Sequence, residues 1–177
     1  LRTTGFSYNN NPTKLVYVSQ SNAGPCFLCR KSDFLKINYA EEQWLDKTYY
    51  ALPDDQIMFY KMFKTGLKIL TSFDSGVVHL DASTTIANFK EKSLKLIFSE
   101  YRNKLIFWHR FIYMPEDKAL LRVWSVMAIL YVLILQSIKF SVGYLFGRKE
   151  EAGYFWRGLK DGFSFLSSDE YKSLNRI

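Results

Sequence analysis

Between Arg122 and Lys139 the chain reads VWSVMAILYVLILQSI (residues 123–138), sixteen residues without a charged side chain. A helix that spans a bilayer needs about 20 apolar residues, so this stretch is long enough only if the flanking cations reach back to the headgroups. Both flanks are basic, because residues 90–122 hold 8 Lys or Arg and residues 139–177 hold 7. A single crossing would leave one basic flank outside, against the positive-inside tendency. We therefore prefer a helix that lies in the interface, or dips in and returns, over a spanning helix or a buried core helix.

The segments on both sides of this stretch are predicted to be helical. An apolar face repeats at steps of three and four residues from Leu94 to Ile112. Pro115-Glu116-Asp117 predicts a break and a new helix start, and residues 154–166 form an amphipathic pattern. Residues 86–177 are therefore predicted to be a basic, aromatic-rich helical tail that associates with a membrane.

The composition excludes several classes of protein. The 177 residues are 48% hydrophobic and 18% aromatic, which is too much apolar surface for a disordered chain. Two cysteines are too few for a disulfide-stapled scaffold. The net charge of +7 is concentrated in residues 90–177, where 15 Lys or Arg face 9 Asp or Glu. No recognition-helix, RNP or zinc-finger pattern accompanies it, so we expect no nucleic-acid partner.

The first half alternates short apolar runs with turn residues, which favours strands and short helices. We predict strands at residues 15–18, 26–30, 67–70 and 77–80, and a short helix or turn at residues 31–39. Residues 41–51 are predicted to be a loop that exposes Trp44, and a helix is predicted from Pro53 to Lys64, ended by Gly66. Cys26 and Cys29 would lie on opposite faces of their strand, so buried structural cysteines are expected.

Two features of this half have a chemical interpretation beside a structural one. Asp54 and Asp55 lie in the first turn of the predicted helix, where free N–H groups stabilise carboxylates whether or not they act as bases. His79 comes at the end of a predicted strand, where it is either a packed side chain or a ligand for a divalent metal, with Asp81 as a neighbour.

Three motifs in order resemble the C-terminal half of a bacterial family 2 glycosyltransferase of GT-A fold. They are a segment led by Gly24, the run Leu52-Pro53-Asp54-Asp55-Gln56 with Gly66 eleven residues after the second acid, and Val77-Val78-His79-Leu80. The resemblance covers residues 15–85. It implies an α/β fold, with residues 1–85 as the acceptor-side part of a GT-A-like catalytic domain with a partial mixed sheet, followed by the helical tail. The family's N-terminal nucleotide-binding half and its Asp-x-Asp motif are not in this chain, so the chain is expected to be inactive alone.

The resemblance also implies the chemistry. Asp55 would be the general base of an inverting transfer from a nucleotide-diphosphate sugar, with Asp54 in the place of the usual Glu. His79 would complete a Mg²⁺ or Mn²⁺ site. Residues Asn22, Ala23 and Gly24 would shape the acceptor side of the cleft.

Trp44 would stack on an acceptor sugar, unless it is a packed loop residue. The acceptor would be a glycan or a lipid-linked sugar in cell-surface glycan synthesis. The enzyme would be peripheral or monotopic, held on anionic lipid at the cytoplasmic face of the plasma membrane. Two alternatives remain. One is a non-enzymatic membrane-peripheral module in which the acids only start a helix, and the other is a soluble helical interaction domain.

Overall fold

The computed structural model describes residues 16–19, 27–72 and 89–175, and these residues are mostly helical. The elements in chain order are β1 (Val16–Ser19), α1 (Lys31–Lys36), the 3₁₀-helix η1 (Tyr39–Leu45), α2 (Asp54–Lys64), β2 (Ile69–Ser72), α3 (Phe89–Phe107), the π-helix η2 (Trp108–Tyr113), α4 (Ala119–Leu145), α5 (Lys149–Ser167) and α6 (Asp169–Ser173).

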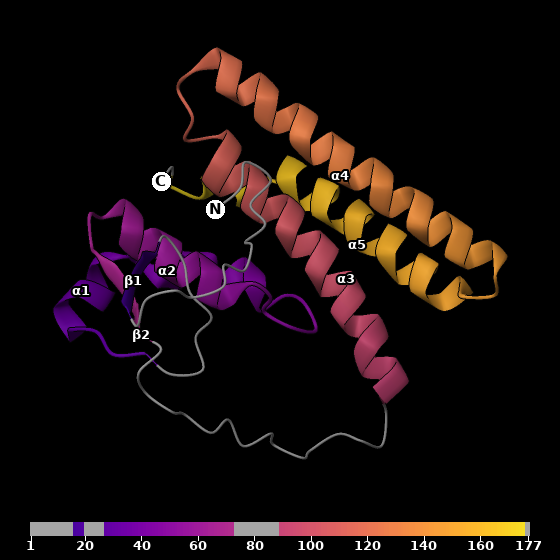
Figure 1. Ribbon diagram of the computed structural model, residues 1–177, viewed down its shortest axis with the longest axis horizontal. Coiled ribbons are helices and arrows are strands. Elements are labelled where there is room, and N and C mark those ends of the chain that lie inside the picture. The colour runs from indigo at the N-terminus through magenta and orange to yellow at the C-terminus, as the bar shows by residue number, and fades with distance from the viewer. Residues whose placement is uncertain (1–15, 20–26, 73–88, 176–177) are drawn as a thin grey trace.

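The three long helices α3, α4 and α5 lie side by side in one bundle, with α4 along its outer edge (Figure 1). Helix α5 runs parallel to α3, since Lys90 pairs with Glu150 at 2.6 Å near the start of both helices. Helix α4 runs antiparallel to them, because a short turn joins it to α5. Its Phe140 stacks on Phe155 of α5, with ring centroids 4.4 Å apart.

Two glycines let α3 and α5 approach closely. A Cβ placed on Gly158 would lie 2.6 Å from the carbonyl oxygen of Phe98, and one on Gly162 would lie 3.1 Å from a methyl of Leu105. The first distance is too short for any side chain, and the obstacle is backbone. The helix pair therefore depends on glycine at position 158.

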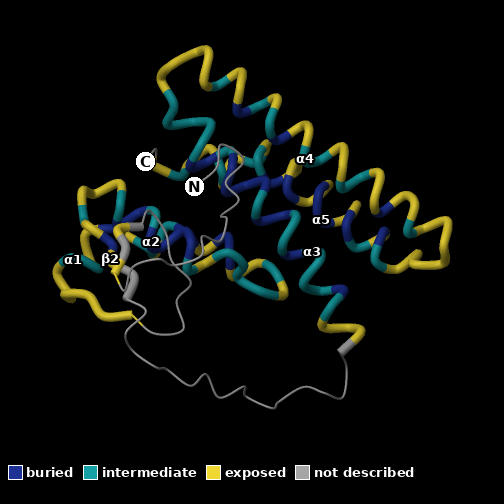
Figure 2. Tube along the Cα trace, in the orientation of Figure 1, coloured by how far each residue is buried: buried dark blue, intermediate teal, exposed yellow. Residues whose placement is uncertain are grey.

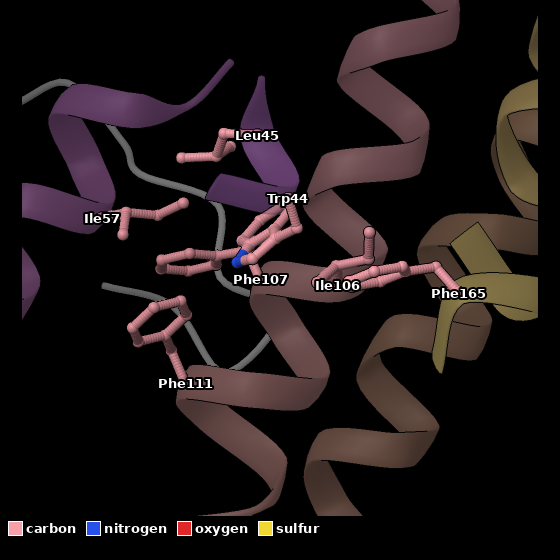
Figure 3. Close-up of a cluster of buried hydrophobic side chains, with 7 residues drawn as sticks. All are labelled: Trp44, Leu45, Ile57, Ile106, Phe107, Phe111 and Phe165. Carbon is pink, nitrogen blue, oxygen red and sulfur yellow. The ribbon is translucent and has the colours of Figure 1, made fainter. Parts of the chain in front are cut away.

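A cluster of buried apolar side chains joins the smaller helices to this bundle (Figure 3). Its members come from η1, α2, α3, η2 and α5: Trp44, Leu45, Ile57, Ile106, Phe107, Phe111 and Phe165. Because they share this cluster, α2 and η1 are docked on the long helices. The domain boundary expected at residue 85 lies outside the described residues.

The expectation of an α/β fold with a partial GT-A-like mixed sheet is wrong. In the described part of the chain the strands are β1 and β2, which form one antiparallel pair. The strand predicted at residues 26–30 is absent from residues 27–30, which have no regular structure. Phe27 packs edge-on against Phe59 of α2, but Leu28 is fully exposed, so the segment buries no strand face. Cys29 is likewise free and exposed, not buried. Cys26 and the strand predicted at residues 77–80 lie outside the described residues.

Other sequence predictions are confirmed. Helix α2 ends in a turn at Gly66, which has a positive φ of 85°, and the apolar face of α3 and η2 is buried at Leu94, Leu105 and Trp108. The chain breaks after η2, and α4 begins four residues beyond Pro115. These elements form where local pattern and tertiary packing agree.

Candidate functional site

The two predicted acids open α2. Pro53 precedes the helix, and the backbone N–H of Asp54 donates to the carbonyl oxygen of Ala51 at 2.7 Å. The hydroxyl of Tyr39 donates to the carbonyl oxygen of Asp54 at 3.1 Å, which fixes this turn to η1. Both acids therefore lie in the first helical turn, as predicted.

Burial raises the pKa of the Asp54 carboxyl above its ordinary value, and the charge of Asp55 raises it further, against the opposing effect of hydrogen bonds from the backbone N–H groups. A carboxylate with a raised pKa is a stronger base than a solvated one. The acidic turn therefore combines a helix-start signal with one carboxylate, that of Asp54, whose basicity is raised by burial.

A buried ion cluster fixes the helix that carries these acids. The carboxylate of Glu42, in η1, accepts hydrogen bonds from Lys61 of α2 at 2.7 Å and from the Nε and Nη2 of Arg110 in η2, each at 3.0 Å. A fourth bond comes from the indole Nε1 of Trp44 at 2.7 Å. The cluster ties η1, α2 and η2 together with charge-assisted hydrogen bonds.

The charges within this cluster compensate one another. Burial alone would raise the pKa of Glu42, but the hydrogen bonds and positive charges of Arg110 and Lys61 outweigh that effect and hold the pKa below its ordinary value. Glu41 adds a second carboxylate, 3.9 Å from Lys61 and 3.7 Å from Arg110. The carboxylate of Glu42 therefore stays ionised inside the protein.

This cluster was not predicted from the sequence, although α2 carries a signal for it. Lys61 lies four residues after Ile57 and three after Met58, on the face of the helix that those residues bury. A lysine on an apolar face needs an acidic partner. Because that partner comes from a different segment, spacing alone does not identify it.

Trp44 is buried, so the expectation of an exposed loop tryptophan is wrong. Its side chain is 1% exposed and packs against Phe165 of α5, with ring centroids 6.2 Å apart. Its backbone carbonyl accepts a hydrogen bond from Arg102 at 3.1 Å. The ring is therefore not available to stack on an acceptor sugar, and the alternative of a packed tryptophan holds. The loop predicted at residues 41–51 is wrong for residues 41–45, which belong to η1.

The remaining predicted site residues lie outside the described part of the chain. These are Asn22, Ala23 and Gly24 on the acceptor side, and His79 as a metal ligand. Within residues 16–19, 27–72 and 89–175, no group of three His, Cys, Asp or Glu side chains is placed to hold a metal ion. The described residues therefore do not make a metal site of their own, and we assign no step to a metal.

Helix α4 presents an unusually apolar surface. By length and composition it could cross a membrane, yet only 11% of its most apolar stretch of 18 residues is buried inside the protein. Figure 2 shows that its outer side is largely exposed, whereas α3 and α5 are buried along their shared side. The interpretation of residues 123–138 as a buried core helix is therefore wrong. The surface is suited to membrane association.

A hollow of about 380 Å³ lies at the end of η2, where His109, Met114 and Tyr171 contribute to its lining. The Nδ1 of His109 and the hydroxyl of Tyr171 are 2.6 Å apart. Burial lowers the pKa of His109 and raises that of Tyr171 to about 12, so both groups are neutral near pH 7. This hollow is not lined by Asp54 or Asp55, and we assign it no chemical role.

Comparisons of the chain with models of protein families, with curated proteins and with solved structures find no match.

Proposed function

We propose that this chain is the acceptor-side and membrane-binding part of a glycosyltransferase. The enzyme would transfer a sugar from a nucleotide-diphosphate sugar to a hydroxyl of a glycan or lipid-linked acceptor. The observation that carries the proposal is the acidic first turn of α2. In the sequence it lies between the Gly24 segment and His79, which is the order of motifs in family 2 glycosyltransferases. That turn belongs to the same packed unit as the membrane-suited helix α4.

In the proposed reaction Asp55 is the general base. The acceptor oxygen attacks the anomeric carbon of the donor, and the bond from that carbon to the diphosphate oxygen breaks. Asp55 takes the hydroxyl proton as the new C–O bond forms, and the diphosphate leaves with the bonding electrons. Attack from the opposite side inverts the anomeric centre. Proton removal of this kind contributes about 10²–10⁴ to the rate.

Asp54 has a supporting role in this proposal. Its carboxylate lies beside Asp55 in the first turn of the helix. The hydrogen bond from Tyr39 to its backbone carbonyl keeps the turn in place. Asn22, Ala23, Gly24 and His79 keep the roles that the sequence resemblance implies.

The membrane supplies the acceptor in this scheme. Basic residues flank the uncharged part of α4, and anionic lipids at the cytoplasmic face of the plasma membrane attract such residues by about 1 kcal/mol each. We therefore propose a peripheral or monotopic enzyme on that face. A lipid-linked acceptor would then present its sugar to the acidic turn on the water side of the membrane.

The test uses the protein expressed in full as its gene encodes it. In Asp55→Asn we expect transfer to fall by about 10²–10⁴-fold, while the affinity for the nucleotide-diphosphate sugar stays within a factor of about two. The matched control is Asp54→Asn, which keeps the base and should lose less activity. An equal loss of donor affinity in Asp55→Asn would contradict the role given to this residue.

The exposed face of α4 favours a second candidate, a non-enzymatic membrane-peripheral module. In that case the acids only start α2, and Asp55→Asn changes neither membrane binding nor biological activity. The same variant therefore separates the two functions.

A further inference from the structure

The outer face of α4 is one continuous apolar surface. Its exposed large side chains include Leu120, Val123, Trp124, Met127, Leu130, Tyr131, Ile134, Leu135, Ile138, Val142 and Leu145. At 3.6 residues per turn these positions lie within an arc of about 140° of the helix circumference. The opposite side, with Ser125, Ile129 and Phe140, is buried against the rest of the protein.

The composition of this surface favours lipid as its occupant. A coiled-coil seam uses a stripe of about two positions in seven, which is narrower than this arc. A layer of acyl chains contacts the whole arc.

The charges around the arc specify the kind of lipid. Residues 118–149 hold 5 Lys or Arg and no Asp or Glu. Lys139 is exposed beside the arc, and the first acids that follow are Glu150, paired with Lys90, and Glu151, paired with Arg148. A net positive segment around an apolar face complements a surface that contains anionic headgroups.

The packing of α5 against α4 bears on how α4 is oriented relative to the bilayer. Phe155 and Leu159 of α5 form one cluster with Phe140 of α4. Leu133 packs against this cluster as well, so the exposed Arg157 and Lys160 of α5 are level with the C-terminal half of α4, between Leu133 and Phe140. If α4 crossed the bilayer, these cations would enter the hydrocarbon layer, which strongly disfavours them.

We propose that α4 lies in the plane of an anionic bilayer, with its outer arc at the boundary between headgroups and acyl chains and with α3 and α5 on the water side. Figure 1 shows the arrangement that this requires, since α4 forms one edge of the bundle along its whole length. The inference rests on the membrane association proposed above and is independent of sugar transfer.

Depth measurements along α4 test this directly. Met127, Ile134 and Ile138 lie along one line of the outer arc, so each is replaced by a single cysteine in a chain carrying Cys26→Ser and Cys29→Ser and is labelled with an environment-sensitive fluorophore. The vesicles contain phosphatidylcholine and phosphatidylglycerol, with quenchers at known acyl depths.

The proposal predicts the same depth at all three positions, to within a few ångströms. The matched control is a label at Ser164, which is exposed on α5 and should stay in water. A crossing helix would instead give depths that differ by about 10 Å between Met127 and Ile134, because each residue rises 1.5 Å along the axis. That gradient would overturn the flat orientation and leave membrane association intact.

Binding to the same vesicles tests the occupant. We expect Ile134→Glu to weaken binding by about tenfold or more, since it removes one buried aliphatic side chain, and the control Ser164→Glu, with the same charge change, to have little effect. Lys139→Gln should weaken binding about fivefold on anionic vesicles only. If the wild-type chain binds no vesicle and the α4 labels become protected as protein concentration rises, the occupant is a second copy. Both this inference and the membrane association then fail.

Discussion

Replacing Glu42 by Gln should destabilise the docking of α2 on the long helices. The carboxylate accepts four hydrogen bonds, from Lys61, Trp44 and twice from Arg110, and its side chain is fully buried. Gln keeps the shape but turns one acceptor oxygen into a donor and removes the charge that compensates two cations. Breaking a buried ion pair on one side costs about 3 kcal/mol or more. For a chain of this size, about 3 kcal/mol lowers the melting temperature by about 6–12 °C.

The assay is thermal and guanidinium unfolding followed by circular dichroism in mild detergent. Glu41→Gln is the control, because its side chain is 20% exposed and lies no closer than 3.7 Å to either cation, so it should cost less than about 1 kcal/mol. Equal effects of the two substitutions would refute the assignment of Glu42 as the centre of the cluster. Replacing Glu42, Lys61 and Arg110 together by apolar residues should recover most of the lost stability.

Three further predictions follow from the same packing. Gly158→Ala should destabilise the protein by about 1–3 kcal/mol, because its methyl would meet the backbone of Phe98. Gly153→Ala has open space around it and should stabilise the protein by about 0.5–1 kcal/mol. Unfolding curves that rank the two variants the other way would contradict the α3–α5 contact. Because the pKa of Glu42 lies below its ordinary value of 4.5, its stabilising contribution should be complete above that pH and be lost as the pH falls through the lower folded-state value. Glu42→Gln should flatten that acid-side decline, and an unchanged decline would show that other groups cause it. The exposed thiol of Cys29 should react with a thiol reagent in the folded protein as fast as in denaturant, and strong protection would contradict its placement.

Local signals in the sequence were enough to predict α2 and the buried face of α3, but not η1, which lies partly in a segment predicted to be a loop. Pro53, the two acids and Gly66 define the start and end of α2, because each acts through the backbone within one turn. The apolar repeat from Leu94 onward defines the buried face of α3 for the same reason. The positions of Asp54 and Asp55 in the candidate site were predictable on this basis.

Features that depend on distant partners were not predictable. Residues 27–30 begin with the apolar pair Phe27 and Leu28, but a strand needs a neighbouring strand, and within the described residues none pairs with them. Trp44 sits in a polar segment, yet Glu42 and Phe165 bury it from two directions. The ion cluster itself joins positions 42, 61 and 110, and only the folded chain brings them together.

The central claim is that one unit joins the acidic turn of α2 to the membrane face of α4. The most direct measurement uses the protein expressed in full as its gene encodes it. For wild type and Ile134→Glu, it compares the rate of sugar transfer to a vesicle-borne acceptor with the rate to a soluble acceptor. The account predicts that the ratio of the two rates falls by about tenfold or more in the variant, in step with the loss of a buried aliphatic contact with lipid. An unchanged ratio, or no transfer to either acceptor by the wild-type protein, would contradict it.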